Sequence, residues 1–476
     1  MTDDRTADVI VVGAGPTGLL LAGDLAAAGT RVAVLEKRSS ESNLTRAFAV
    51  HARTLEQLDA RGLADELLGL GRKMYTLNVF DSAPLSFDIL NGATRFPFVL
   101  ITPQYNVERL LDRRARDAGA RLVSGTEVIG LTQDDNGVDV TARGPDGETH
   151  SWHADYVVGA DGVRSAVRNL LGLPFPGKTV VSSMMLADVR LDHPPPVLTL
   201  HGSKVGLCVV VPYGDGWYRI VAWDRANQVP EDAPLTLDDV ASTARGIFGA
   251  DLGVHDARFL SRFHSDERQV PAYRVGRVFL AGDAAHVHSP AGGQGMNTGL
   301  QDAANLGWKL AVAVGGRGAS DMLDSYQSER WPVGRSAVRS SGALIRAAAL
   351  PSPALRQLRN TLVRMAGRIP PIMRTILQRM SGIGIGYAGD GRVGERVADV
   401  SLAGAVPRLY EALRNGRFVL LLGHGMAPGV TDRAIEVVRA DGDPETLLVR
   451  PDGYLAWVGT DVRSPGLHTA LDYWGA

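Results

Sequence analysis

The chain has 476 residues, of which 45% are hydrophobic and 21% charged, and its net charge at pH 7 is −2. This composition is typical of a globular protein of two or three domains with a large core, and the lack of a basic excess argues against a nucleic-acid partner. The single cysteine, Cys208, excludes a disulfide framework or a thiol metal cluster. The chain starts with a polar, acidic segment unlike a signal peptide, and no apolar run reaches the roughly 18 residues of a membrane span, so we expect a cytoplasmic protein.

The first 40 residues predict a β-α-β unit. Residues 8–13 (DVIVVG) predict a buried strand, 19–28 a Leu- and Ala-rich helix, and 31–35 a second strand. A G-x-G-x-x-G sequence joins the first strand to the helix. Its first glycine makes a tight turn, its second lets the backbone approach a pyrophosphate at the helix N-terminus, and its third lets helix and strand pack closely. The candidate residues are Gly13, Gly15, Pro16, Thr17 and Gly18.

An acidic residue closes the second strand. Glu36 lies 18 residues after Gly18 and is followed by Lys37. The Glu36 carboxylate suits the hydroxyls of a ribose and would repel a 2′-phosphate, so we expect the resident dinucleotide not to be NADP. This fingerprint alone does not distinguish FAD from NAD, because both cofactors carry an adenosine ribose and a pyrophosphate.

The following segments alternate between helix and strand and then change character. We expect helices at 53–70 and 107–118 and strands at 121–132, 137–142 and 155–159. Short alternating stretches from 179 to 268 predict an antiparallel sheet inserted into the α/β domain. A buried strand at 277–281 and a helix at 299–314 return to the first pattern.

The last third of the chain contains an arginine-rich segment and then a separate unit. Residues 333–389 hold nine arginines and no aspartate or glutamate, and prolines interrupt their candidate helices. We interpret this segment as packed helices with solvated arginines; the alternatives are an anionic or lipid-facing surface and an oligomer contact. The final unit begins near residue 394. It predicts a helix at 407–415 and strands at 417–422, 434–440 and 446–457.

Two later segments distinguish the cofactor. They are 155–168 (DYVVGADGVRSAVR) and 277–310 (RVFLAGDAAHVHSPAGGQGMNTGLQDAANLGWKL), and each places a Gly/Asp turn after a buried strand. In the second segment Asp283 is placed to bond a sugar hydroxyl, and the glycines at 292–295 start a helix suited to a pyrophosphate or an anionic flavin edge. The helix after the G-x-G-x-x-G sequence and the helix after 292–295 both begin at glycines, and two such N-termini indicate a long, extended cofactor. His286 and His288 have no nearby carboxylate cluster, so we expect no metal site.

Together these motifs resemble those of the single-component FAD-dependent aromatic hydroxylases, the family of p-hydroxybenzoate hydroxylase. They are most similar to its polyketide and antibiotic branch, which includes rifampicin, tetracycline and anthracycline or angucycline monooxygenases. The resemblance implies a Rossmann-like α/β FAD-binding domain (1–178 and 269–393) with an inserted antiparallel-sheet substrate domain (179–268). The last unit (394–476) is similar to the thioredoxin-like tail of this branch but has no CxxC, so we assign it no redox role.

The resemblance also implies which residues contact FAD. Glu36 would bind the adenosine ribose. Asp161 and Gly162 match a motif linked to both FAD and the nicotinamide donor. Three of the implied contacts, Gln104, Asp161 and Asp283, have helix capping as their alternative role. For a fourth, Arg46, the alternative is a plain surface position. The other implied contacts are Arg46 and Gln104, Val128 near the adenine, Gly282 and Asp283 at the ribityl or pyrophosphate region, Pro290 beside the reactive flavin edge, and Gly293, Gly295, Met296 and Asn297 along the isoalloxazine.

Candidate substrate contacts lie on the middle sheet. They are Arg219, which is expected to face the flavin, together with Tyr213 and Trp223, since aromatic walls suit a flat polycyclic guest. The same region also contains His201, Trp217, Tyr218, Phe248 and Phe263, and aromatic residues equally fill ordinary cores. The sequence identifies no catalytic base.

The activity implied by the resemblance is that of an NAD(P)H-dependent flavin monooxygenase. FAD reduced by NADPH or NADH would react with O₂ to a C4a-hydroperoxide and hydroxylate a phenolic polycyclic or polyketide-type molecule in a dry pocket. Alternatives are a Baeyer–Villiger-type or quinone-forming enzyme, a membrane epoxidase or ubiquinone-pathway hydroxylase, an NAD-dependent dehydrogenase, and a flavoprotein that binds a small molecule without turnover. A flavin halogenase is disfavoured because W-x-W-x-I-P is missing. The sequence does not distinguish a biosynthetic enzyme from an antibiotic-inactivating one, or a monomer from a homodimer.

Overall fold

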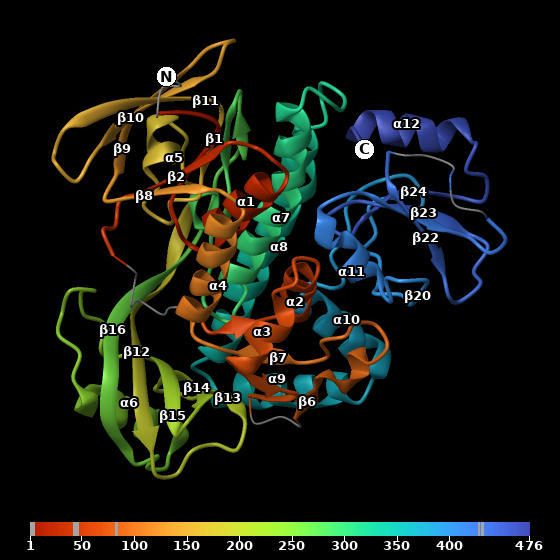
Figure 1. Cartoon of the computed structure of the whole chain (residues 1–476). Helices are drawn as coiled ribbons and strands as arrows, with labels where there is room; N and C mark the ends of the chain where they lie inside the picture. The colour runs from red at the N-terminus through yellow and green to blue at the C-terminus, as the bar shows by residue number, and fades with distance from the viewer. Residues whose placement is uncertain (1–4, 41–46, 81–83, 427–428, 430–432) are drawn as a thin grey trace.

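The computed structural model describes residues 5–40, 47–80, 84–426, 429 and 433–476. Within these residues, four β-sheets of eight, eight, five and three strands are packed with long helices. Figure 1 shows the first sheet at the upper left, the second at the lower left and the C-terminal sheet at the right, with α7 (Gly295–Val314) and α8 (Asp324–Ala348) between them. None of the described helices is long and apolar enough to cross a bilayer.

The predicted β-α-β unit forms the centre of the first sheet. In spatial order the sheet contains β17 (Arg274–Val275), β18 (Val278–Leu280), β11 (Thr149–Gly159), β1 (Thr6–Val12), β2 (Val32–Glu36) and β8 (Arg121–Ser124). The hairpin of β9 (Glu127–Gln133) and β10 (Val138–Arg143) joins the sheet through β11. β1 pairs in parallel with β2 and β11, and Val9, Ile10 and Val11 are completely buried. Their continuous apolar run is typical of a parallel strand covered on both faces.

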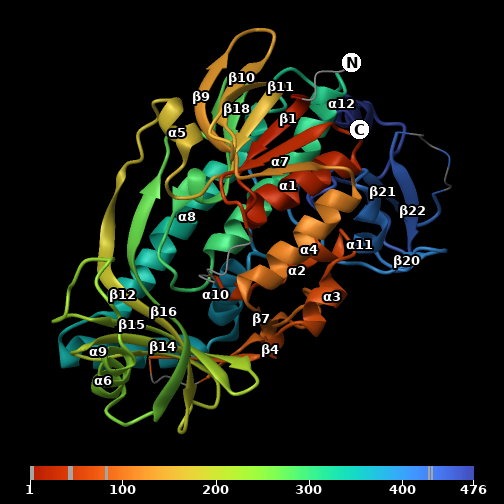
Figure 2. The ribbon, with the colours of Figure 1, turned by 60° about the vertical axis from the view of Figure 1, so that its left-hand side comes forward.

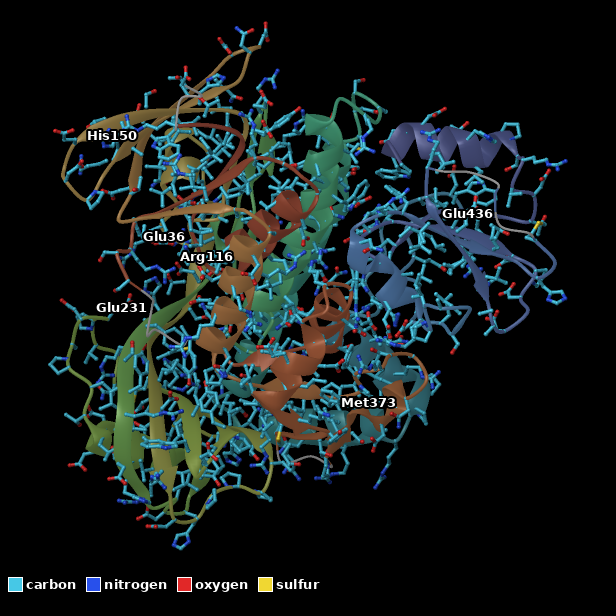
Figure 3. All side chains as sticks on the ribbon, in the orientation of Figure 1. Glu36, Arg116, His150, Glu231, Met373 and Glu436 are labelled. Atoms are coloured by element: carbon cyan, nitrogen blue, oxygen red, sulfur yellow. The ribbon has the colours of Figure 1, made fainter. Side chains whose placement is uncertain are left out.

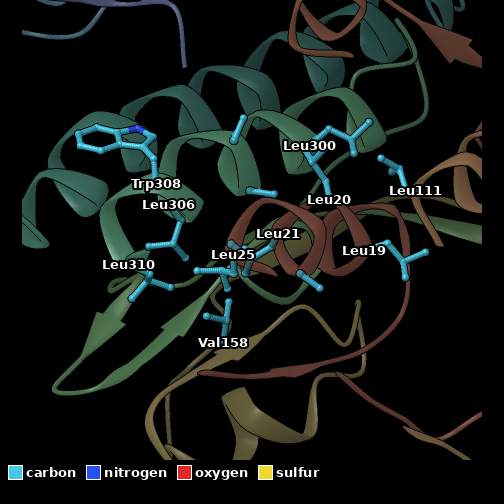
Figure 4. Packing of buried hydrophobic residues seen from close by; sticks show 14 of the residues in the cluster. Leu19, Leu20, Leu21, Leu25, Leu111, Val158, Leu300, Leu306, Trp308 and Leu310 are labelled. Atoms are coloured by element: carbon cyan, nitrogen blue, oxygen red, sulfur yellow. The ribbon is translucent and has the colours of Figure 1, made fainter. Parts of the chain in front are cut away.

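The helices α1 (Pro16–Ala27), α4 (Gln104–Asp117) and α7 pack beside this sheet. Figure 4 shows Leu20 of α1 beside Leu300 of α7 in the core. The junction of β1 and α1 depends on Gly18, because a Cβ at this position would lie 2.0 Å from the carbonyl oxygen of Gly13. The third glycine of the fingerprint is therefore required by the packing of the fold itself.

Two predicted elements before residue 140 are each divided by a glycine. The single helix predicted at 53–70 is wrong: the chain forms α2 (Ala52–Asp59) and α3 (Ala64–Gly69), separated by Gly62 with a φ of +73°. The single strand predicted at 121–132 is also wrong, because Gly125, with a φ of +69°, turns the chain from β8 into β9. In both segments the apolar pattern continues across the glycine, so periodicity alone does not reveal the turn.

The antiparallel sheet predicted between 179 and 268 is present and recruits strands from outside that segment. Its spatial order is β19 (His286–Val287), β16 (Val254–Gln269), β12 (Gly177–Leu191), β15 (Trp217–Asp224), β14 (Gly206–Gly214), β13 (Leu198–Gly202), β5 (Thr76–Val79) and β6 (Leu85–Ser86). α6 (Leu237–Phe248) covers one face, and α8 approaches the other (Figure 2). A small sheet of β3 (Ala49–Val50), β7 (Val99–Ile101) and β4 (Arg72–Met74) lies beside it.

The remaining helices precede the C-terminal sheet or flank it. They are α5 (Ala166–Leu170), α9 (Pro353–Gly367), α10 (Pro370–Ser381), α11 (Leu409–Ala412) and α12 (Pro465–Trp474). The C-terminal sheet has the order β20 (Leu402–Ala403), β22 (Ile435–Arg439), β21 (Val419–Leu422), β23 (Thr446–Val449) and β24 (Leu455–Gly459). The helix predicted at 407–415 is shorter than expected, because the chain tightens into a 3-10 turn after α11. The single strand predicted at 446–457 is wrong, because a turn at 450–453, where Gly453 has a φ of +79°, separates the antiparallel strands β23 and β24.

A buried network attaches the C-terminal unit to α7 and α8. Arg450 donates hydrogen bonds to Glu329 (2.6 and 3.0 Å) and to Asp452, and Lys309 Nζ lies 2.8 Å from Glu329. Burial disfavours the Glu329 carboxylate, but Arg450 and Lys309 outweigh that effect and hold its pKa well below the usual range. Removing one partner would leave an uncompensated buried charge, so the network fixes how the units dock.

Candidate active site

A cavity of about 460 Å³ opens where the carboxyl ends of β1 and β2 approach the second sheet. In open α/β sheets this is where ligands bind. Figure 3 labels Glu36 at this junction. Most of the predicted cofactor residues line the cavity, although they come from distant parts of the chain: Gly13, Gly15, Pro16, Thr17, Glu36, Lys37, Gln104, Val128, Asp161, Gly162, Asp283, Pro290, Gly293, Gly295 and Met296.

Three predicted residues lie behind the cavity lining. Gly18 lies at the β1–α1 junction. Gly282 has a φ of +60°, and a Cβ added there would lie 2.7 Å from Thr17 Oγ1. Asn297 is 3% exposed and makes internal hydrogen bonds. The fourth exception, Arg46, lies outside the described residues.

The N-terminus of α1 opens into the cavity. Gly15 occupies the N-cap position, and the first turn that follows contains proline and no acidic residue. A Cβ at Gly15 would meet no atom of the described residues within 4 Å, so the backbone faces open space. Gly13 has a φ of +102°, and a Cβ there would lie 2.5 Å from the carbonyl oxygen of Ala160. This arrangement leaves the first N–H groups of α1 available to an anion.

Glu36 marks the opposite side of the same turn. Its carboxylate accepts hydrogen bonds from the Ala14 N–H (2.7 Å) and from Arg38 Nε (2.9 Å). Burial disfavours the charged form, but these hydrogen bonds outweigh burial and lower the pKa of Glu36. Glu36 therefore stays ionised. Arg38 also donates to it from its backbone N–H (2.8 Å) and from Nη2 (3.2 Å), so a ribose hydroxyl would share or replace the contacts of the Arg38 side chain. Arg38 also lines the cavity and was not among the predicted residues, because its pairing with Glu36 is visible only in the structure.

A second helix N-terminus, that of α7, lies at the far end of the cavity. Gly292 and Gly293 turn the chain with φ values of +86° and +62°, and Gly295 starts the helix. Asn297 fastens this turn to β3, because its Oδ1 accepts the His51 N–H (2.8 Å) and its Nδ2 donates to Ala49 O and to Gly293 O. His51 was missed by the sequence reasoning. It donates from Nε2 to Gly292 O at 2.7 Å and so holds the turn from a second side.

Asp161 combines both of the roles considered for it. Its Oδ2 accepts the N–H groups of Ala166 and Val167 (2.7 and 3.2 Å), so it caps α5. Its Oδ1 has no hydrogen-bond partner in the described part of the chain, and burial raises the pKa of the carboxyl. The neighbouring Gly162 has a φ of +78° with open space where a side chain would be. One carboxylate oxygen is therefore left for a ligand in the cavity.

The two histidines of the H-x-H sequence have separate environments. His286 Nε2 is hydrogen-bonded to the fully buried Asp302 at 2.7 Å, and Arg330 Nε donates to the same carboxylate at 2.7 Å. Asp302 also accepts the Gly282 N–H, so this triad holds the Gly282–Asp283 turn. His288 lines the cavity, and burial lowers its pKa to about 4, which keeps it neutral at physiological pH.

The cavity continues onto an apolar part of the second sheet. Leu186, Val221 and Phe263 line it there. Of the predicted substrate residues, Arg219 is completely buried and paired with Asp188 at 2.8 and 2.9 Å, and its guanidinium lies 5.0 Å from the ring centre of Tyr213.

The other aromatic side chains of this sheet divide between its two faces. Trp223 belongs to the apolar cluster that includes Leu186 and Val221. His201 stacks on Phe248 of α6, on the opposite face, away from the cavity. The sheet therefore presents one aromatic face to the cofactor loops and one to α6.

These features fit a bound FAD. Two uncapped helix N-termini suit the pyrophosphate and an anionic flavin edge, and the Glu36 carboxylate suits the adenosine ribose. Between these ends, the open space beside Gly15 leaves room for the cofactor, and the Asp161 oxygen without a hydrogen-bond partner in the described residues offers it a polar contact. FAD supplies the redox chemistry, while the chain binds it, orients it against the apolar wall and excludes water.

Comparisons with known proteins agree with this fit. The family described as FAD binding domain matches residues 6–341, and aromatic-ring hydroxylase, C-terminal, matches residues 390–476. Rifampicin monooxygenase of Streptomyces venezuelae is 39% identical, and 12-dehydrotetracycline 5-monooxygenase/anhydrotetracycline 6-monooxygenase of Streptomyces rimosus is 36% identical, each over 98% of both chains.

Among solved structures, an anhydrotetracycline hydroxylase from Streptomyces rimosus superimposes with a TM-score of 0.87 at 36% identity, covering 98% of this chain and 99% of that one. The similarity extends over the FAD-binding sheet, the second sheet and the C-terminal unit alike. It confirms the predicted fold class and the predicted FAD cofactor. The chain belongs to the FAD-dependent aromatic-ring hydroxylases and is a flavin monooxygenase.

Proposed function

We propose that this monooxygenase uses NAD(P)H and O₂ to hydroxylate a phenolic, polycyclic, polyketide-type molecule. The observation that carries the proposal is the continuity of one cavity, from the helix N-termini that suit FAD to the apolar wall of Leu186, Val221 and Phe263. A flat aromatic guest buries its faces on such a wall. Relatives named for rifampicin and tetracycline compounds support the same substrate class.

The roles of single residues form part of this proposal. Glu36 binds the adenosine ribose, the α1 N-terminus binds the pyrophosphate, and the turn at Gly293 holds the flavin ring. We place the domain boundaries at 178, 268 and 393. The strands from β12 to β16 support the first two, although β5, β6 and β19 join the same sheet from outside this segment, and the separate C-terminal sheet supports the third. NADPH is the favoured donor, because the family resemblance leans towards it, and we place the enzyme in the cytoplasm, where NAD(P)H is available.

The chain contributes binding and electrostatics to the reaction. The positive end of the α7 dipole stabilises negative charge on the flavin edge. His288 also lines the cavity, and burial lowers its pKa to about 4, so it stays neutral and the helix end supplies the positive potential without it. Arg219 and Asp188 lie on the same face of the sheet as Leu186 and Val221, and their ion pair balances the two charges on that face. The apolar patch of Leu186, Val221 and Phe263 beside an anion-binding helix end suits a reaction that must exclude water.

The test is oxidation of NADPH and of NADH by the FAD-loaded enzyme, with a panel of tetracyclines, rifamycins and anthraquinones. The proposal expects one scaffold to stimulate oxidation and to gain an oxygen atom. Stimulated oxidation without an oxygenated product would contradict hydroxylation, and a panel without any stimulation would favour binding without turnover.

A matched pair of variants tests where the substrate lies. Phe263→Ala removes an aromatic contact from the cavity wall, worth about 1–2 kcal/mol, and should raise KM roughly 5- to 30-fold with FAD content unchanged. Phe248→Ala alters the opposite face of the sheet, where Phe248 stacks on His201, and should leave KM unchanged. Equal effects of both variants on KM would show that the substrate does not bind against this wall.

A further inference from the structure

The helices α9 and α10 expose a continuous apolar stripe. Seven large aliphatic side chains on them are between 44% and 56% exposed. On α9 their spacing is three, four and three residues, and on α10 three and four, so each set lies on one helical face. The residues are Leu355, Leu358, Leu362 and Met365 of α9 and Ile369, Ile372 and Ile376, which lead into and along α10.

The opposite faces of the two helices are anchored to the protein. Arg359 is buried, donates to Ala347 O at 2.7 Å and stacks over the Phe80 ring at 4.0 Å. Met373, labelled on α10 in Figure 3, and Leu377 are buried in the core. The exposed stripe is therefore the outer face of helices that are already packed on one side, and nothing in the fold requires it to be apolar.

The charge around the stripe has one sign. Arg364, Arg368, Arg374 and Arg379 are exposed on the same two helices. The whole segment 333–389 contains no aspartate or glutamate, so these arginines have no acidic neighbour in their own segment. Aliphatic residues flanked by arginines are typical of helices that lie in a membrane interface, where the side chains extend their charged ends to the phosphates.

We propose that α9 and α10 dock this enzyme on the surface of an anionic lipid membrane. The apolar stripe would enter the interface between headgroups and acyl chains, and the arginines would contact lipid phosphates. A second copy of the chain fits this face less well, because a two-fold contact would bring one set of arginines against the other without acidic partners. The contact is peripheral, since no described helix is long and apolar enough to cross a bilayer.

The apolar stripe and the proposed substrate wall lie on opposite sides of α9. Val363 of α9 and Ile345 of α8 belong to the same apolar cluster as Leu186, Val221 and Phe263, which line the cavity. An α-helix is roughly 10 Å across, so the lipid surface and the wall lie on two sides of α9. A membrane concentrates lipophilic polycyclic molecules, and docking here would load the cavity from the lipid phase. This last step rests on the proposed function, whereas the docking itself does not.

The test is flotation of the FAD-loaded full-length enzyme with vesicles of phosphatidylcholine alone and of phosphatidylcholine with phosphatidylglycerol in equal parts. We expect binding only to the anionic vesicles, weakened by high salt. Leu358→Ser/Leu362→Ser/Ile372→Ser should raise the half-saturating lipid concentration more than 10-fold, and R364Q/R368Q/R374Q should abolish the preference for phosphatidylglycerol. Leu70→Ser and Leu170→Ser, exposed leucines elsewhere, are the matched controls and should bind as the unmodified enzyme does.

The outcomes separate docking from folding and from catalysis. FAD content and thermal unfolding report on the fold, and oxidation of NADPH with a water-soluble substrate reports on the proposed function; the variants should leave all three unchanged. No binding to anionic vesicles, or equal binding of the Leu358→Ser/Leu362→Ser/Ile372→Ser variant, would overturn the proposal. A concentration-dependent dimer that this variant dissolves, without vesicle binding, would assign the face to a second copy.

Discussion

Gly15→Ala should weaken FAD binding without weakening the apoprotein. Gly15 has a φ of −80° and a ψ of 177°, which alanine adopts without strain. A Cβ at this position meets no described atom within 4 Å and projects into the cavity. The free energy of unfolding of the apoprotein should therefore change by less than about 1 kcal/mol, and a small increase is expected because alanine restricts the unfolded chain.

The loss in FAD affinity follows from what the methyl group displaces. If the pyrophosphate rests on the α1 N-terminus, the methyl group separates the phosphate oxygens from the first N–H groups. Hydrogen bonds to a charged group are worth about 1.5–3 kcal/mol each, so loss of one predicts an increase in Kd of roughly 10- to 150-fold. Titration of the apoprotein with FAD, followed by flavin fluorescence, measures this Kd.

A matched variant shows whether the effect is local. Gly18→Ala places a Cβ 2.0 Å from Gly13 O, so it should destabilise the apoprotein itself, which Gly15→Ala should not. The reasoning is refuted if Gly15→Ala binds FAD within two-fold of the unmodified protein, or if it unfolds as readily as Gly18→Ala.

Three further changes address the support of the cavity and the attachment of the C-terminal unit. Asn297→Ala leaves the buried His51 N–H without its acceptor and should cost about 1–3 kcal/mol in urea unfolding, together with weaker FAD binding. Asp302→Asn leaves the buried Arg330 charge uncompensated and should cost about 3–5 kcal/mol in thermal unfolding; a cost below about 1 kcal/mol would contradict its role. The depressed pKa of Glu329 contributes stability that is present above about pH 4.5 and is lost as the pH falls below it, so Glu329→Gln should flatten the decline in stability on acidification, and an unchanged slope would contradict this assignment.

The sequence predicted the parts of the fold that depend on local pattern. The unit from 8 to 35 was predicted because a Val- and Ile-rich strand, three spaced glycines and an apolar helix leave few alternatives. The turn before α7 was predicted for the same reason. The breaks at Gly62 and Gly125 were not predicted, because a glycine within an apolar pattern is compatible with both a continuous element and a turn.

The residues that support the site were harder to predict because their roles depend on distant contacts. His51 holds the turn before α7 from 241 positions away in the chain, and Asp302 joins His286 to Arg330 across two helices. β5 joins the second sheet beside β13, a parallel pairing that no local pattern encodes. Only the tertiary arrangement brings these groups together.

The most direct test of the central account is the fate of the oxygen atom. The FAD-loaded enzyme is supplied with NADPH, ¹⁸O₂ and the scaffold that stimulates its NADPH oxidation, and the product is examined by mass spectrometry. The account predicts a hydroxylated product that carries a single ¹⁸O atom from O₂. A product whose new oxygen comes from water, or NADPH oxidation that yields only hydrogen peroxide, would contradict it.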